Sequence, residues 1–160
     1  LMTGIIIAGR TGAAFAAQLG TMQVNEEIDA YQVLGISAID FLVLPRMLAL
    51  MLMVPLLTLY SGFIGMLAGL LVSVTIFDIG VFEYYTETLR ALEFKQFAVG
   101  LSKGTVYGAM IAFAGCLRGM QCGRSAEAVG HAATSAVVTA ILLITIAASI
   151  MTIVYYQLGI

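Results

Sequence analysis

Residues 47–77 read MLALMLMVPLLTLYSGFIGMLAGLLVSVTIF, a run of 31 residues without a charged side chain. As one helix this run would rise about 46 Å, whereas a helix of about 20 residues already crosses a bilayer core. We therefore expect a membrane-spanning helix over residues 41–77 that tilts or bends. Pro55 lies inside it and is the natural place for a kink.

The composition of the whole chain is also that of a membrane protein. Of its 160 residues, 61% are apolar and 10% are charged, and the mean hydropathy is +1.05. Soluble domains are about 45–50% apolar and about 25% charged, and a domain of this size still exposes roughly a third of its surface. These values exclude a lone soluble domain, intrinsic disorder and a coiled coil. They predict an all-α polytopic membrane protein.

Charged residues divide the chain into apolar and polar segments. Residues 1–9 are apolar but too few to span a bilayer, so we expect the end of a transmembrane helix that begins in preceding chain. About three full transmembrane helices should follow it. The expected segments are 1–9 (end of a transmembrane helix), 10–40 (cytoplasmic coupling segment), 41–77 (transmembrane helix), 78–96 (periplasmic amphipathic segment), 97–117 (transmembrane helix), 118–133 (cytoplasmic loop) and 134–160 (C-terminal transmembrane helix).

The distribution of basic residues predicts the orientation. Segments 10–40 and 118–133, together with Arg46, hold four basic residues, whereas segment 78–96 holds two, or three with Lys103. The positive-inside rule places the first set in the cytoplasm and the C-terminus outside. The net charge of −2 gives no indication of nucleic-acid binding.

A short amphipathic helix is expected inside the segment 10–40. Apolar side chains recur at helical spacing, Gly35 should end the helix, and acidic residues fall in its first turns. The acids could be a solvated face or a docking surface for a basic partner. The apolar stripe favours docking, because a helix of about three turns is not stable alone. The stripe is Val24, Ile28, Tyr31 and Leu34, and the acids are Glu26, Glu27 and Asp29.

Small residues recur at intervals of four, which lets helix backbones approach closely in lipid. Packing within the chain, a dimer interface and a moving face are all compatible with this pattern. The glycines that we single out for helix packing are Gly65, Gly69, Gly100, Gly104 and Gly108.

Candidates for catalysis are missing, and one candidate for ligand binding stands out. The chain has one histidine, two cysteines six residues apart and no nucleotide-binding fingerprint, so we expect no enzyme activity, metal or bound cofactor. Lys103 is the ionisable residue expected inside a span. It either contacts a ligand in the membrane or extends its amine to the outer interface.

Several motifs resemble those of the MlaE family, the permease subunits of ABC-type phospholipid transporters. The most specific is AGRTGAAFAAQLGTM at residues 8–22, followed by VNEEIDA at residues 24–30. Pro45-Arg46 before the span with Pro55, Lys103 with VYG at 106–108 and then Cys116, and GHAATSAVV at 130–138 are similar too. The resemblance covers essentially the whole chain, whereas family members have more chain at the N-terminus.

The resemblance implies a function and partners. A family member dimerises with a second copy and sits on an ABC ATPase (MlaF-like) that binds ATP and Mg²⁺. A periplasmic ring of MCE-domain proteins (MlaD-like) caps it, and a STAS-domain subunit (MlaB-like) attaches to the ATPase. The complex moves phospholipids between the inner and outer membranes of Gram-negative bacteria and maintains the lipid asymmetry of the outer membrane.

The resemblance also implies site residues. A basic residue in the span after the periplasmic helix corresponds to Lys103, which with Tyr107 would face the lipid path. The ATPase-coupling residues would be Arg10, Met22, Val24, Glu26, Glu27, Ile28, Asp29 and Tyr31. A secondary transporter or channel, which would need several charged groups in the membrane, and a non-transporting scaffold are the alternatives.

Overall fold

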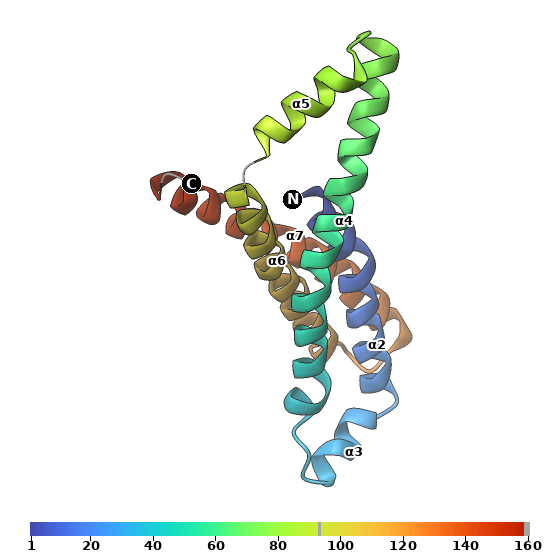
Figure 1. Cartoon of the computed structure of the whole chain (residues 1–160). Helices are drawn as coiled ribbons and strands as arrows, with labels where there is room; N and C mark the ends of the chain where they lie inside the picture. Colours follow the sequence, from blue (N-terminus) through green and yellow to red (C-terminus); the bar gives the residue numbers. More distant parts are fainter. Residues whose placement is uncertain (93, 159–160) are drawn as a thin grey trace.

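The computed structural model describes residues 1–92 and 94–158, and it shows helices and no strand in these ranges. Figure 1 shows a bundle from which one long helix projects. The elements are α1 (Met2–Ile7), η1 (Ala8–Gly12), α2 (Ala13–Val24), α3 (Glu27–Val33), η2 (Ile39–Val43), α4 (Leu44–Ile76), α5 (Val81–Ala91), α6 (Phe94–Met120) and α7 (Ala126–Gln157).

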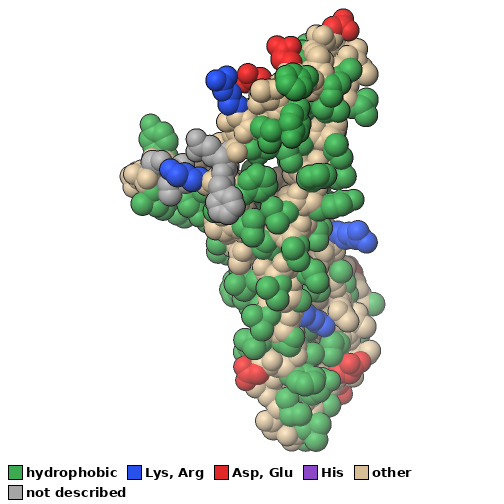
Figure 2. Space-filling view, viewed as in Figure 1, with side chains coloured by type: hydrophobic (Ala, Val, Ile, Leu, Met, Phe, Trp, Pro, Cys, Tyr) green, Lys and Arg blue, Asp and Glu red, His purple; other side chains and the backbone are tan. Residues whose placement is uncertain are grey.

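Three helices in the described part are long and apolar enough to cross a membrane: Ile39–Ile76, Lys95–Met120 and Ala126–Gln157. In Figure 2, acidic side chains lie at the two ends of the long axis, and hydrophobic side chains cover most of the visible face between them. These features confirm the predicted all-α polytopic membrane fold, because apolar side chains face outward where lipid can cover them.

The N-terminal part differs from the expectation of a helix that ends at residue 9. A helical stretch continues from Met2 to Val24, with a π-helical turn at Ala8–Gly12. Residues 10–24, expected to belong to the cytoplasmic coupling segment, are therefore part of a packed helix. The reason is tertiary: Ala16, Leu19 and Gly20 of α2 are buried, and α2 packs against α6 and α7.

The helix α7 begins earlier than expected, at Ala126 in place of residue 134. Ser125 caps it, since the Ser125 hydroxyl accepts a hydrogen bond of 3.2 Å from the Ala128 backbone N–H. The helix α6 ends at Met120 and α7 begins at Ala126. The predicted loop 118–133 is therefore reduced to the short connection between these two helices. The polar and glycine residues of this region concealed the first turns of α7.

The core of the bundle combines alanines with larger apolar side chains such as Ile111 and Ile144 around α6. The helices α2, α4 and α7 all pack against α6, and α7 contributes a stripe of buried residues at intervals of three or four. This spacing places the stripe on one helix face. The stripe is Ala132, Ala136, Ala140, Ile144 and Ala147.

The helix α4 passes through Pro55 without a break and continues beyond the bundle (Figure 1). Its buried residues are Leu50, Val54 and Pro55, all in its first half. The helix α5 folds back from the far end of α4, and the Tyr84 hydroxyl donates a hydrogen bond of 3.0 Å to the Met66 carbonyl oxygen. The far half of α4 and α5 thus form an arm at the end opposite α3.

Candidate functional site

An apolar groove lies between α4 and α6, on the side of Pro55 toward the arm. Its volume is about 560 Å³. Leu92, in the connection between α5 and α6, also lines it. The lining from the two helices is Pro55, Thr58, Leu59, Gly62, Phe63 and Met66 of α4, with Gln96, Phe97, Gly100 and Leu101 of α6.

A smaller and more polar hollow adjoins the groove, because Thr58 and Gly100 line both. Its volume is about 250 Å³, and it brings together Lys103, Tyr107 and Thr152. The two residues predicted for a lipid path therefore meet in one cavity. Tyr107 is 6% exposed and belongs to the buried core as well.

Side chains of α7 hold the Lys103 ammonium in the hollow. Lys103 Nζ donates a hydrogen bond of 3.2 Å to Thr152 Oγ1 and lies 5.6 Å from the centroid of the Tyr155 ring. The Tyr155 hydroxyl in turn shares a hydrogen bond of 2.5 Å with the Ser102 hydroxyl. An ammonium has three donors, so this arrangement leaves Lys103 able to bind an anionic group as well. Sequence reasoning missed Ser102, which is adjacent to Lys103, and Thr152 and Tyr155, which lie about fifty residues farther along the chain.

Together the groove and the hollow have the chemistry of a site for an amphiphile. The groove offers apolar surface, and the hollow adds a cation with hydroxyl groups around it. Ligand sites commonly combine a mainly apolar wall with a few polar groups that set the orientation of the ligand.

The glycines predicted for helix packing fall into two groups. A Cβ at Gly108 would lie 2.6 Å from the Leu50 carbonyl oxygen, and one at Gly104 would lie 3.1 Å from Pro55 Cα. Both glycines thus allow α6 to approach α4 within the chain. In contrast, a Cβ at Gly65 or Gly100 would have no neighbouring atom within 4 Å. A Cβ at Gly69 would face the Tyr84 hydroxyl of α5.

Two further glycines of α6 serve the same purpose on the side of α2, and sequence reasoning missed them. A Cβ at Gly115 would lie 2.9 Å from the Gly12 carbonyl oxygen, and one at Gly119 would lie 2.7 Å from Leu19 Cβ. Their spacing of four residues was a visible signal.

The predicted coupling helix is present as α3, shorter than the expected stretch of residues 24–34. It ends in a Schellman motif: Gly35 has a φ of +73°, and the Ile36 N–H donates to the Tyr31 carbonyl oxygen at 3.0 Å. Ile28 is buried, and the Tyr31 ring lies 5.7 Å from the Phe41 ring. The predicted apolar stripe is incomplete, because Val24 belongs to α2 and Leu34 is 72% exposed.

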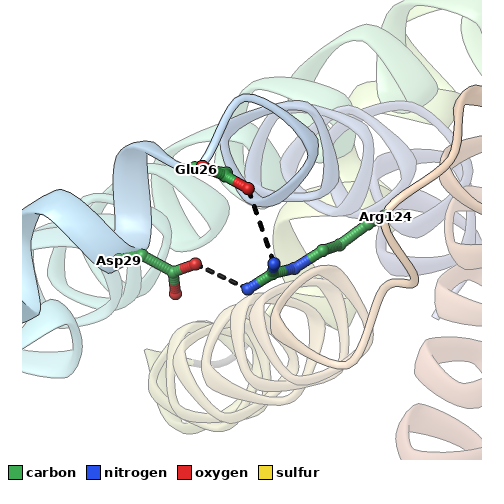
Figure 3. A network of polar contacts seen from close by, with 3 residues as sticks. All are labelled: Glu26, Asp29 and Arg124. Carbon is green, nitrogen blue, oxygen red and sulfur yellow. Dashed lines mark hydrogen bonds and ion pairs between the residues drawn. The ribbon is translucent and has the colours of Figure 1, made fainter.

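The three acidic residues of this region have different partners. Arg124, in the connection between α6 and α7, contacts Asp29 at 2.7 Å and Glu26 at 3.5 Å (Figure 3). Glu27 instead accepts a hydrogen bond of 3.3 Å from Asn25 and is exposed. The sequence leaves open whether these three acids form a solvated face or a docking surface. The structure pairs Glu26 and Asp29 with Arg124 and leaves Glu27 without an ion pair among the described residues.

The remaining predicted coupling residues lie on the N-terminal helix. Arg10 is exposed on the π-helical turn η1, and Met22 is half-buried near the end of α2. The structure does not bring Arg10 together with α3, because the whole of α2 separates them. Arg46, which served above in the orientation count and as a motif residue, lies over the Phe15 ring of α2 with 5.4 Å between its guanidinium carbon and the ring centroid.

Comparisons with known proteins agree with this architecture. A family model described as Permease MlaE matches residues 1–154. A probable ABC transporter permease of Rickettsia prowazekii is 38% identical over 157 residues, which cover 98% of this chain and 61% of the relative. A probable ABC transporter permease of Synechocystis is 40% identical over 146 residues, which cover 91% and 56% of the two proteins.

A plant protein is similar as well. The Arabidopsis thaliana protein named TRIGALACTOSYLDIACYLGLYCEROL 1, chloroplastic, is 38% identical over 157 residues, which cover 98% of this chain and 45% of the relative. The chain thus spans about three fifths or less of the length of these relatives. From the family match and these identities over nearly its full length, the chain belongs to the MlaE family of membrane permeases.

Proposed function

We propose that this chain handles phospholipid in the membrane subunit of an ATP-driven lipid transporter. The observation that carries the proposal is the apolar groove joined to the hollow with Lys103. The acyl chains would occupy the groove, and the phosphate of the headgroup would contact the Lys103 ammonium, which suits an anion as a strongly hydrated point charge. The name of the Arabidopsis relative is that of a diacylglycerol glycolipid, which favours a lipid cargo.

The proposal includes an ATPase partner, because relatives are named ABC transporter permeases. The ATPase would bind ATP and Mg²⁺ and contact the region of α3, where Glu27, Val33 and Leu34 are exposed. A second copy of the chain, a ring of MCE-domain proteins and a STAS-domain subunit complete the proposed assembly. We place it in the inner membrane of a Gram-negative bacterium, with α3 in the cytoplasm and the C-terminus in the periplasm, where it would maintain outer-membrane lipid asymmetry.

Site-specific photocross-linking to phospholipid tests this function. A photoreactive residue replaces Leu59, which lines the groove, in the full-length permease reconstituted with its ATPase. We expect lipid adducts at residue 59 whose yield changes when ATP is added, because the groove belongs to the transport path.

The matched control places the photoreactive residue at Leu142, which is 59% exposed on α7 and contacts surrounding lipid in any case. Its adduct yield should not depend on ATP. Equal and ATP-independent yields at both positions would contradict the proposed function.

A further inference from the structure

The helix α3 has few attachments to the rest of the molecule. Among the described helices it packs against α2 alone, which precedes it in the chain. Tyr31 adds a ring contact to Phe41 of η2. Arg124, in the segment between α6 and α7, contacts Glu26 and Asp29 and so links α3 to these two helices (Figure 3).

The Arg124 guanidinium bridges the two carboxylates. Its Nη2 donates a hydrogen bond of 2.7 Å to Asp29 Oδ2, and its Nη1 lies 3.5 Å from Glu26 Oε1. A planar guanidinium with donors in a fixed fork can hold two acceptors in a defined direction, which a lysine cannot do. Glu26 has a φ of +60°, in the left-handed region, at the turn between α2 and α3.

The backbone that carries Arg124 is itself held in place. Two residues before it, Cys122 packs against α2 at Gly20. Its Sγ lies 3.1 Å from the position that a Cβ would take at that glycine. The residue after it, Ser125, caps α7. A displacement of α3 that pulls on Arg124 therefore acts directly on the first turn of α7.

The helix α7 leads from this contact to the ligand cavity. Near its other end, Thr152 and Tyr155 contact Lys103 in the polar hollow. The side chains of Arg124 and Asp29 are 61% and 41% exposed, and such exposed ion pairs add little to stability. We therefore assign to this contact the role of holding α3 in position relative to α7.

We propose that Arg124 is a positioning residue that couples movement of α3 to α7, and through α7 to the Lys103 hollow. This inference rests on the proposed transport function, in which the ATPase moves α3. It divides the acidic cluster by role: Glu26 and Asp29 hold Arg124, whereas Glu27 faces outward.

The test measures phospholipid transferred per ATP hydrolysed by the full-length permease reconstituted with its ATPase. For Arg124→Gln we expect normal co-purification of the ATPase and a fall of about two- to fivefold in this ratio, the range for loss of an exposed ion pair. Asp29→Asn leaves the Glu26 contact, so its effect should be equal or smaller. The double variant should be no worse than Arg124→Gln, because Arg124→Gln already removes the contact to Asp29.

Charge exchange supplies a further arm. Arg124→Asp combined with Asp29→Arg should recover part of the ratio that Arg124→Asp alone loses. The matched control is Glu127→Gln, which removes a nearby exposed charge whose one ion pair within the described ranges is with His131 at 4.0 Å. It should leave the ratio unchanged.

A distance measurement keeps the inference testable if the ratio cannot be measured in a variant. Spin labels at Gln32 and Glu127, both exposed, report the separation of α3 and α7. A nucleotide analogue should leave this distance constant in the parent protein and change it in Arg124→Gln.

Three results would overturn the coupling role: an unchanged ratio in Arg124→Gln, additive effects of the two single variants, or equal distance changes with and without Arg124. In each case transport by the parent complex would leave the proposed function standing. A parent complex that associates with its ATPase and transfers no phospholipid would instead refute the proposed function, and this inference with it.

Discussion

At the scale of the residue, Lys103 shows how a single charge inside a membrane helix is accommodated. Its ammonium contacts Thr152 and the face of Tyr155, both on α7, and lines the polar hollow. Both contacts help to compensate the loss of water around the charge. The sequence left open whether the lysine contacts a ligand or extends its amine to the outer interface. In the structure the lysine turns toward α7 and the hollow.

We expect Lys103→Met to weaken phospholipid binding in the groove by about tenfold, the effect of losing a charge-assisted hydrogen bond worth about 1.5 kcal/mol. Methionine keeps the length and the apolar stem, so expression should remain normal. The yield of lipid adducts at position 59 measures the effect, and Lys103→Arg, which retains the charge, is the control. Unchanged adduct yield in Lys103→Met would show that the lysine does not contact the headgroup.

At the scale of the element, the packing of α6 against α4 depends on Gly104 and Gly108. A methyl group at Gly108 would meet the Leu50 carbonyl oxygen, which belongs to the backbone and cannot give way as a flexible side chain can. Beyond Gly104 the two helices diverge, which leaves Gly100 unobstructed and opens the groove. The same small-residue face thus provides a contact at one end and a cavity at the other.

Gly108→Ala should therefore destabilise the permease by about 1–3 kcal/mol, the usual cost of overpacking. Thermal denaturation in detergent measures the change as a lower melting temperature. Gly65→Ala is the matched control, because Gly65 also lies inside a long helix but has nothing within 4 Å of its Cβ position. If both variants melt at the same temperature as the parent, the close approach of α4 and α6 does not stabilise the protein.

At the scale of the whole molecule, α3 and the α6–α7 connection lie at one end and the arm of α4 and α5 at the other (Figure 1). Three basic residues lie near the α3 end, namely Arg46, Arg118 and Arg124, whereas Arg90 and Lys95 lie near the arm. From this difference the positive-inside rule predicts that the α3 end is cytoplasmic. The exposed apolar face of α5, with Phe82, Tyr85 and Leu89, would then lie at the opposite membrane interface.

Cysteine labelling tests this orientation. Phe82→Cys and Val33→Cys are placed on side chains that are 83% and 88% exposed, and the two native cysteines are buried. With the outer membrane permeabilised, a membrane-impermeant maleimide should label residue 82 from the periplasm, whereas residue 33 should react only in inverted vesicles. The reverse pattern would place α3 outside and would contradict contact with a cytoplasmic ATPase.

The sequence by itself determined the features that depend on local composition. Long apolar runs specified the spanning helices, because hydropathy acts residue by residue along a helix. Gly35 marked the end of α3, since a glycine readily adopts the left-handed conformation there. The small-residue spacing indicated close helix approach, and Lys103 was recognisable from its position alone as an ionisable residue inside a span.

Only the tertiary structure decided which surfaces meet. Arg124 pairs with Asp29 across 95 positions of the chain, and Lys103 contacts Thr152 across 49, distances over which no local pattern carries information. Residues 10–24 were expected in the cytoplasmic coupling segment 10–40, yet α6 and α7 cover one side of this stretch, which forms a packed helix. The groove exists because α4 and α6 touch near Gly108 and separate past Gly104, a crossing that is set by backbone contact between two helices.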